Sequence, residues 1–67
     1  MIILSIKEIL EHYRKLSGIS ITELGNAIGL SYSRLYVRYA QPGTWRLSEL
    51  IDAYDFLQVP DEERRFQ

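Results

Sequence analysis

The residues with the clearest chemistry are three arginines in one stretch of the chain. Residues 31–46 contain Arg34, Arg38 and Arg46 and no acidic residue, which gives this stretch a charge of +3. A guanidinium group presents planar donors that match phosphate oxygens. Residues 47–67 carry six acids against two arginines, so the overall net charge of −1 hides a separation of charge. This separation favours an anionic partner for residues 31–46.

Catalytic and metal-binding patterns are much weaker. The chain has no cysteine and one histidine, His12, which we interpret as a solvated side chain on the outer face of a helix. Glu49, Asp52 and Asp55 are spaced along one helix surface without a converging histidine or oxygen ligand, so we interpret them as a solvated acidic face. The chain has no glycine-rich phosphate loop and little room for a pocket. We therefore expect no enzyme, metal site, cofactor or small-molecule substrate.

The length of 67 residues predicts one small domain near the lower limit for a self-sufficient core. Without cysteine, its stability must come from helix packing and from a partner subunit, if there is one. No apolar run approaches the roughly 20 residues of a membrane span, and Met1–Leu4 is too short for a secretory signal. We therefore expect a cytoplasmic protein. Met1–Leu4 forms either a short strand or an apolar arm packed on the helices.

Two short helices joined by a tight turn must position the arginines, within residues 20–40. Ser20 and Glu23 have the spacing of a capping box, which predicts a helix to about residue 28. Gly29 follows, where a helix ends in a left-handed residue that glycine adopts most easily. Ser31 is the expected N-cap of the second helix. On that helix Ser33, Tyr36, Val37 and Ala40 point away from the core.

Three further helices complete the predicted structure. Ser5 and Glu8 open the first, which runs to about Leu16, and the second runs roughly from Trp45 to Leu57. A short last helix is expected at residues 59–63. The apolar residues at core-facing spacing in the first two are Ile6, Ile9, Leu10, Tyr13, Leu16, Leu47, Leu50, Ile51, Tyr54 and Leu57. In the last segment, Val59 and Phe66 either finish the core or bind another copy.

The central stretch resembles the helix-turn-helix of the phage Cro and repressor proteins, also called the xenobiotic-response-element family. That motif has a small residue in its first helix and a glycine at the turn four residues later. Apolar residues stand just before, just after and six beyond that glycine. These positions are occupied here by Gly25, Gly29, Ile28, Leu30 and Leu35. The resemblance implies an all-α, lambda-repressor-like bundle of four or five helices in a single domain, residues 1–67.

Two residues depart from the family pattern. Ile21 stands where many members carry a glutamine that contacts DNA phosphate. Arg38 falls where the family usually buries an apolar residue, so it either lays its stem along the core or reaches out to phosphate.

The resemblance implies sequence-specific binding of double-stranded DNA by a bacterial or phage transcriptional regulator, with the second helix of the motif in the major groove. A homodimer on an inverted repeat is expected, because so few basic residues should bind weakly alone. The base-reading residues would be Tyr32, Ser33, Tyr36 and Val37. The phosphate-binding residues would be Ser31, Arg34, Arg38, Gly43, Thr44 and Arg46.

Two residues of this region have alternative roles. Tyr32 either contacts DNA or packs its ring on the helix pair. Trp45 is more easily explained as a buried anchor for the loop of residues 41–44 than as a stacking platform, because one aromatic ring alone makes a poor base-stacking surface.

A rival hypothesis places a protein-interaction module on the same fold, such as an antitoxin-like or host-takeover protein. The low net charge and the surface at Tyr36 and Val37 suit that hypothesis nearly as well. Salt-sensitive retention on a heparin or DNA column distinguishes the two.

Overall fold

The computed structural model describes residues 4–66, and within them the chain is entirely helical, as predicted. Helix α1 spans Ile6–Leu16, α2 Ile21–Ile28, α3 Tyr32–Ala40 and α4 Leu47–Phe56, with 3-10 turns η1 at Pro42–Thr44 and η2 at Asp61–Glu63. The choice between strand and arm for Met1–Leu4 falls almost wholly outside the described residues. None of the helices in residues 4–66 is long and apolar enough to cross a membrane.

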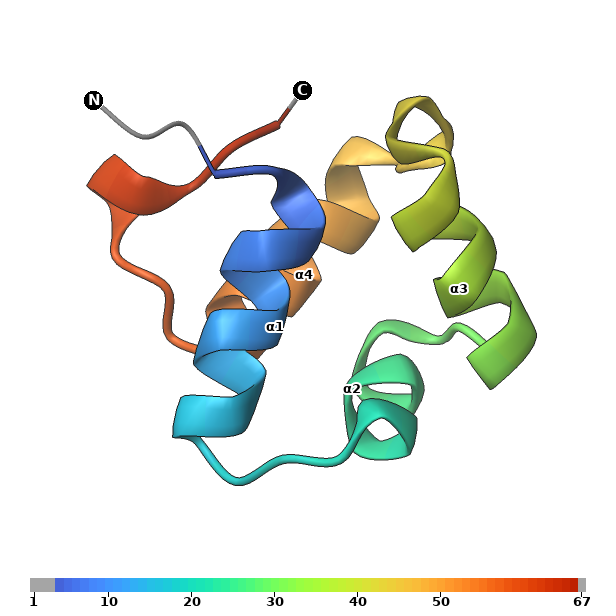
Figure 1. Ribbon diagram of the computed structural model, residues 1–67, viewed down its shortest axis with the longest axis horizontal. Coiled ribbons are helices and arrows are strands. Elements are labelled where there is room, and N and C mark those ends of the chain that lie inside the picture. Colours follow the sequence, from blue (N-terminus) through green and yellow to red (C-terminus); the bar gives the residue numbers. More distant parts are fainter. Residues whose placement is uncertain (1–3, 67) are drawn as a thin grey trace.

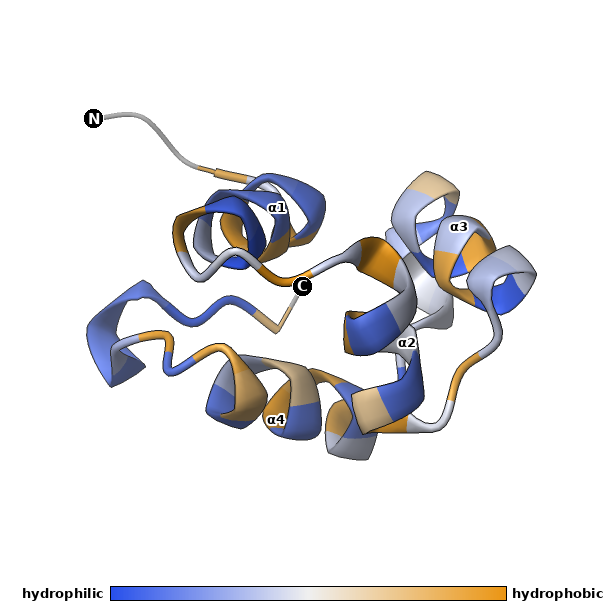
Figure 2. Ribbon diagram, turned by 90° about the horizontal axis from the view of Figure 1, so that it is seen from below, coloured by the Kyte–Doolittle hydropathy of each residue, from blue (hydrophilic) through white to orange (hydrophobic). Residues whose placement is uncertain are grey.

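The helices form a compact globule in which α2 packs against both α3 and α4 (Figures 1 and 2). Helix α3 lies at one end of the long axis of the molecule, and η2 lies near the opposite end (Figure 1). Figure 2 colours η2 as uniformly hydrophilic, in agreement with its sequence Asp-Glu-Glu. The acids of η2 are therefore kept away from α3.

Side-chain caps start the first three helices as the sequence predicts. In α1 the Ser5 hydroxyl accepts from the Glu8 amide at 3.2 Å, and the Glu8 carboxylate accepts from the Ser5 amide at 3.1 Å. Ser20 and Glu23 make the same reciprocal pair at the start of α2. These caps satisfy amide groups that have no partner within the helix, so the helix starts are set locally by the sequence.

The turn between α2 and α3 depends on two glycines. Gly29 ends α2 with φ of +75°, in the left-handed region. Gly25 lies against the turn, since a Cβ added there would stand 2.7 Å from the carbonyl oxygen of Leu30. The Leu30 amide in turn donates to the Gly25 carbonyl at 2.9 Å. The missing side chain thus makes room for the backbone of the turn, and the side chain of Leu35 on α3 lies in ordinary contact distance of the same place, at 3.9 Å.

One hydrophobic cluster joins all four helices. Its buried members are Ile6, Ile9, Leu10, Leu24, Ile28, Leu30, Leu35, Tyr39, Leu50, Ala53, Tyr54, Leu57 and Val59. Three residues predicted to face the core are instead exposed: Leu16 at 73%, Leu47 at 62% and Ile51 at 39%. Leu16 is the last residue of α1 and Leu47 the first of α4, where the apolar stripe continues past the packed part of each helix.

The ends of the last elements differ from the prediction. Helix α4 begins at Leu47 because Trp45 and Arg46 have extended backbones, with ψ of 134° and 145°. Just after α4, Gln58 adopts a left-handed φ of 56°, a position where a glycine would have marked the helix end in the sequence. The expected short last helix is a single 3-10 turn.

Candidate nucleic-acid interface

The outer face of α3 carries the exposed side chains that the helical spacing predicts. Tyr32, Ser33, Tyr36 and Val37 are all exposed, and Ala40 is exposed at the end of the helix. On the opposite face Leu35 and Tyr39 are buried in the core. Helix α3 therefore presents one small, partly aromatic surface at its end of the molecule (Figure 1).

Tyr32 and Tyr36 form a pair on this surface. Their hydroxyls are 3.2 Å apart, with Tyr32 donating, and their ring centroids are 4.7 Å apart in an edge-on arrangement. Tyr32 is 52% exposed, Tyr36 48% and Val37 45%, so the pair extends into an apolar patch. The ring of Tyr32 thus packs on Tyr36 and still faces solvent, which leaves it free to meet a partner.

Arg34, on α3, and Arg46, at the start of α4, are exposed cations. Arg34 lies in the first turn of α3, where its amide donates to the hydroxyl of Ser31 at 3.3 Å. Arg46 lies directly before α4. Within residues 4–66, no ion pair involves either guanidinium group. Both are therefore available to an anion.

Arg38 occupies a different environment. Its Nε and Nη2 donate to the two carboxylate oxygens of Glu49 at 3.0 and 3.3 Å, and the two side chains are only 17% and 12% exposed. The sequence left open whether Arg38 lies along the core or reaches out to phosphate. Its guanidinium is instead paired with Glu49 inside the protein, which does not fit a phosphate contact. Arg38 is therefore not one of the exposed cations.

Glu49 is the residue that the sequence interpretation missed. The prediction of a solvated acid is wrong for Glu49, although Asp52 and Asp55 are exposed. Its Oε1 also accepts from the backbone N–H of Arg46 at 3.0 Å. Burial raises its pKa, but the hydrogen bonds from Arg38 and from the Arg46 amide bring the pKa below its ordinary value. Glu49 is the third residue of α4, the position from which the glutamate of a capping box reaches back to the N-cap amide, and this position could have revealed its role.

The loop after α3 uses part of its predicted phosphate-binding groups internally. The Thr44 amide and hydroxyl both donate to the Gln41 carbonyl, at 2.9 and 2.7 Å. These donors are therefore already engaged within the turn. Gly43 is exposed, and a Cβ added to it would meet nothing within 4 Å, so this side of the loop is open to a large partner.

Trp45 anchors the loop as predicted. It is partly buried and packs against the hydrophobic cluster, with its ring centroid 6.3 Å from that of Tyr39. Ile21 also packs partly buried against the cluster. Being apolar, it offers no hydrogen bond to a phosphate where the resembled family often has a glutamine.

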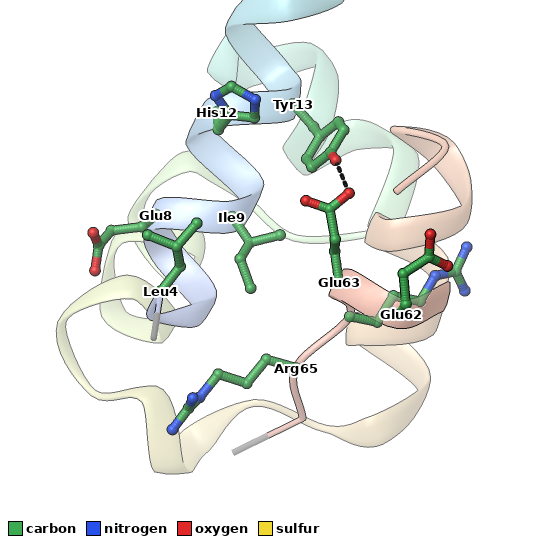
Figure 3. A pocket seen from close by; sticks show the side chains of 9 residues that line it. Leu4, Glu8, Ile9, His12, Tyr13, Glu62, Glu63 and Arg65 are labelled. Carbon is green, nitrogen blue, oxygen red and sulfur yellow. Dashed lines mark hydrogen bonds between the residues drawn. The ribbon is translucent and has the colours of Figure 1, made fainter. Parts of the chain in front are cut away.

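A separate hollow of about 580 Å³ lies between α1 and residues 62–65 (Figure 3). The expectation of little room for a pocket was too strict. The Tyr13 hydroxyl donates to Glu63 in this hollow, and the exposed His12 lies beside Tyr13 (Figure 3). Side chains of both charges line the hollow. Within residues 4–66 no three histidine or carboxylate side chains are grouped so that they could hold a metal ion.

Comparison with known proteins adds no assignment. No protein-family model, no curated protein and no solved structure matches this chain. The function must be argued from the geometry of α3 and the residues around it.

Proposed function

We propose that this protein is a sequence-specific double-stranded DNA-binding regulator of transcription, of bacterial or phage type, in which α2 and α3 act as a helix-turn-helix. The observation that carries the proposal is the exposed face of α3, which carries Tyr36 and Val37, together with the exposed Arg34 on the same helix and the exposed Arg46 at the start of α4. A helix in this role enters the major groove, and side chains on its outer face meet the base edges.

The side chains on α3 suit base recognition at close range. The hydroxyls of Ser33 and Tyr36 can exchange hydrogen bonds with base edges, and Val37 can contact the methyl group of thymine. Serine, valine and alanine on this face are small, which favours a close approach of the helix to the groove floor. Tyr32, in the first turn, extends the same surface.

Two exposed arginines supply the attraction to phosphate. Each phosphate that a cation neutralises contributes about −0.9 to the slope of log K against log salt. Arg34 and Arg46 would therefore give a slope of about −2 for one protomer and about −4 for two. Ser31, the N-cap of α3, and Gly43, in η1, are exposed positions that could approach the same phosphates.

This small number of contacts supports a homodimer on DNA. Two copies would bind the half-sites of an inverted repeat whose centres lie about 10 bp apart, or a multiple of that spacing. Selection of bound duplexes from a random DNA pool tests the dimer separately from DNA binding.

One observation favours a different partner. The Tyr32 hydroxyl donates to Tyr36, so one polar group of the exposed patch is used inside the patch. The remaining surface of two aromatic rings and Val37 also resembles the centre of a protein-protein interface, where tyrosine is enriched. A protein-interaction module is therefore the second candidate.

Selection of bound duplexes from a random DNA pool at moderate salt, followed by sequencing, tests the proposal. An enriched inverted repeat supports both the function and the dimer, and its spacing gives the geometry. A single enriched half-site supports the function and rejects the dimer. No enrichment by folded protein rejects DNA recognition. A lack of salt-sensitive retention on a heparin column would then direct the search to protein partners.

A further inference from the structure

One carboxylate joins the end of α3 to the start of α4. Glu49 accepts two hydrogen bonds from the guanidinium of Arg38, in the last turn of α3, and one from the backbone N–H of Arg46. The oxygen Oε1 is shared, since it receives both Arg38 Nε and the Arg46 amide at 3.0 Å. A single side chain thus contacts both ends of the loop that connects the two helices.

That loop otherwise has few ties to the rest of the molecule. Residues 41–44 and 46 are exposed, and the hydrogen bonds of Thr44 and Trp45 are made to Gln41 and Pro42 inside the loop itself. Packing of the Trp45 ring is its other attachment to the core. The Arg46 carbonyl accepts from the Leu50 amide at 3.1 Å, which ties Arg46 to α4. Glu49 is the side chain that ties Arg46 to Arg38 of α3.

The geometry points to Glu49 as a positioning residue for DNA binding: by holding Arg38 and the Arg46 amide together, it fixes the backbone from which the exposed Arg46 side chain extends, next to the last turn of α3. This inference rests on the proposed DNA-binding function. It also gives Arg38 a role that differs from the predicted phosphate contact, because Arg38 acts by holding Glu49 and not by meeting DNA.

The chemistry of the pair favours a fixed arrangement over an exchange of partners. Two parallel N–H···O bonds between a guanidinium and a carboxylate are stronger and more directional than neutral hydrogen bonds. If Arg38 left Glu49, the Glu49 carboxylate would remain as a poorly solvated charge without a partner. A phosphate that bound Arg38 would therefore have to supply the free energy lost in breaking this ion pair. The duplex is therefore expected to meet the exposed Arg46 while Arg38 stays on Glu49.

The test measures the affinity for a selected duplex across a range of salt concentrations. The variants are Glu49→Ala, Arg38→Met, Arg46→Ala and the double variant Glu49→Ala/Arg46→Ala, each at a temperature where circular dichroism shows it folded. Asp52→Ala is the matched control, because it removes an exposed acid from the same helix. Glu49→Gln keeps a neutral acceptor for the Arg46 amide and serves as the conservative variant.

We expect Glu49→Ala and Arg38→Met each to weaken binding about tenfold, as for loss of one charged hydrogen bond. Glu49→Gln should recover part of this loss. The salt slope should fall by about 0.9 in Glu49→Ala, and Arg46→Ala should cost little more in that background, because the Arg46 contact is already lost. Asp52→Ala should not weaken binding.

Three results would overturn the inference. Unchanged affinity of folded Glu49→Ala, with only a lower melting temperature, would make Glu49 purely structural. If Glu49→Ala and Asp52→Ala both bound DNA more tightly and to the same extent, Glu49 would affect binding only through its negative charge. If the losses in binding free energy of Glu49→Ala and Arg46→Ala added fully in the double variant, the two residues would act independently. If wild-type protein selects no duplex, the proposed function itself fails, and this inference with it.

Discussion

The Tyr39 hydroxyl on α3 donates a 3.0 Å hydrogen bond to Oε2 of Glu11 on α1, 28 residues away in the sequence. Arg14 holds the same carboxylate through two bonds of 2.8 and 2.9 Å. The preceding residue of α3, Arg38, is held by Glu49 of α4. Two carboxylates from different helices therefore accept hydrogen bonds from consecutive residues of α3, and together these bonds resist rotation of α3 about its axis.

Removing the Tyr39 hydroxyl should remove one of these hydrogen bonds and destabilise the fold. We expect Tyr39→Phe to lower the free energy of unfolding by about 1 kcal/mol, since the bond is partly buried and one of its partners is charged. Urea unfolding followed by the fluorescence of Trp45, the one tryptophan, measures the change. Tyr36→Phe, on the exposed face, is the control and should change stability by less than about 0.5 kcal/mol. Equal losses in the two variants would contradict this role for the hydroxyl.

Acid should destabilise the fold through Glu11 and Glu49. The hydrogen bond from Arg14 lowers the pKa of Glu11 below its ordinary value of 4.5, and hydrogen bonds lower that of Glu49 in spite of its burial. Such a carboxylate stabilises the fold fully above the unfolded pKa and loses this contribution as pH falls through the folded pKa. The free energy of unfolding should therefore decline below about pH 4.5.

A pH series of urea unfolding curves checks this, with Glu11→Gln as the comparison. The variant should be less stable than wild type at pH 7 and should lose less stability on acidification. A pH profile of Glu11→Gln that runs parallel to that of wild type would show that Glu11 carries no linked stability.

Alanine at position 25 should be destabilising although alanine is the better helix former. The Leu30 carbonyl, 2.7 Å from the added Cβ, belongs to the backbone of the turn and cannot move away freely. We expect Gly25→Ala to cost about 1 to 3 kcal/mol by thermal or urea unfolding, more than the roughly 1 kcal/mol gained in helix propensity. Gly43→Ala is the matched control, in open space. A Gly25→Ala variant as stable as wild type would mean that the turn adapts.

Removal of Arg34 should weaken DNA binding without changing which sequence is preferred. A phosphate contact is independent of sequence, so Arg34→Ala should lose affinity equally for a selected duplex and a random one. The salt slope should fall by about 0.9 per protomer. Lys7→Ala, which removes an exposed cation from α1, should have little effect. If Arg34→Ala binds as wild type does, its assigned role is wrong.

Val37 should make the preferred sequence depend on thymine methyl groups. Replacing thymine by deoxyuracil removes one methyl and leaves the hydrogen-bonding groups unchanged. At the contacted position this should weaken wild-type binding about fourfold, as expected for one buried methyl group. In Val37→Ala the difference between the two bases should shrink. Equal wild-type affinity for thymine and deoxyuracil at every position would exclude this contact.

Local signals in the sequence predicted the frame of the molecule well. The capping boxes at Ser5 and Ser20 and the left-handed Gly29 are decided by residues three or four apart, so their effect does not depend on the rest of the fold. The outward face of α3 followed from helical spacing in the same way. The end of α4 lacked such a signal, because the left-handed residue there is Gln58.

The pairing of Arg38 with Glu49 could not be predicted in this way. The two residues are 11 apart, and their contact depends on how α3 and α4 cross, which no local pattern specifies. From the sequence, an arginine in the place of an apolar residue left two possibilities for Arg38, a stem along the core or a contact with phosphate. Finding its partner Glu49 required the packed structure, and the same packing decided that Leu16 and Leu47 stay exposed.

Because η2 lies at the far end from α3, charge is distributed unevenly along the long axis of the molecule. The three acids of η2 outnumber the two arginines that follow it, Arg64 and Arg65, by one. In the field of a polyanion this end is repelled while Arg34 and Arg46 are attracted, which turns the protein before contact. Encounters would then begin with α3 foremost, and a larger fraction of collisions would be productive. When copies lie side by side on one duplex, each would present its acidic end to the surrounding solution and repel further layers of protein.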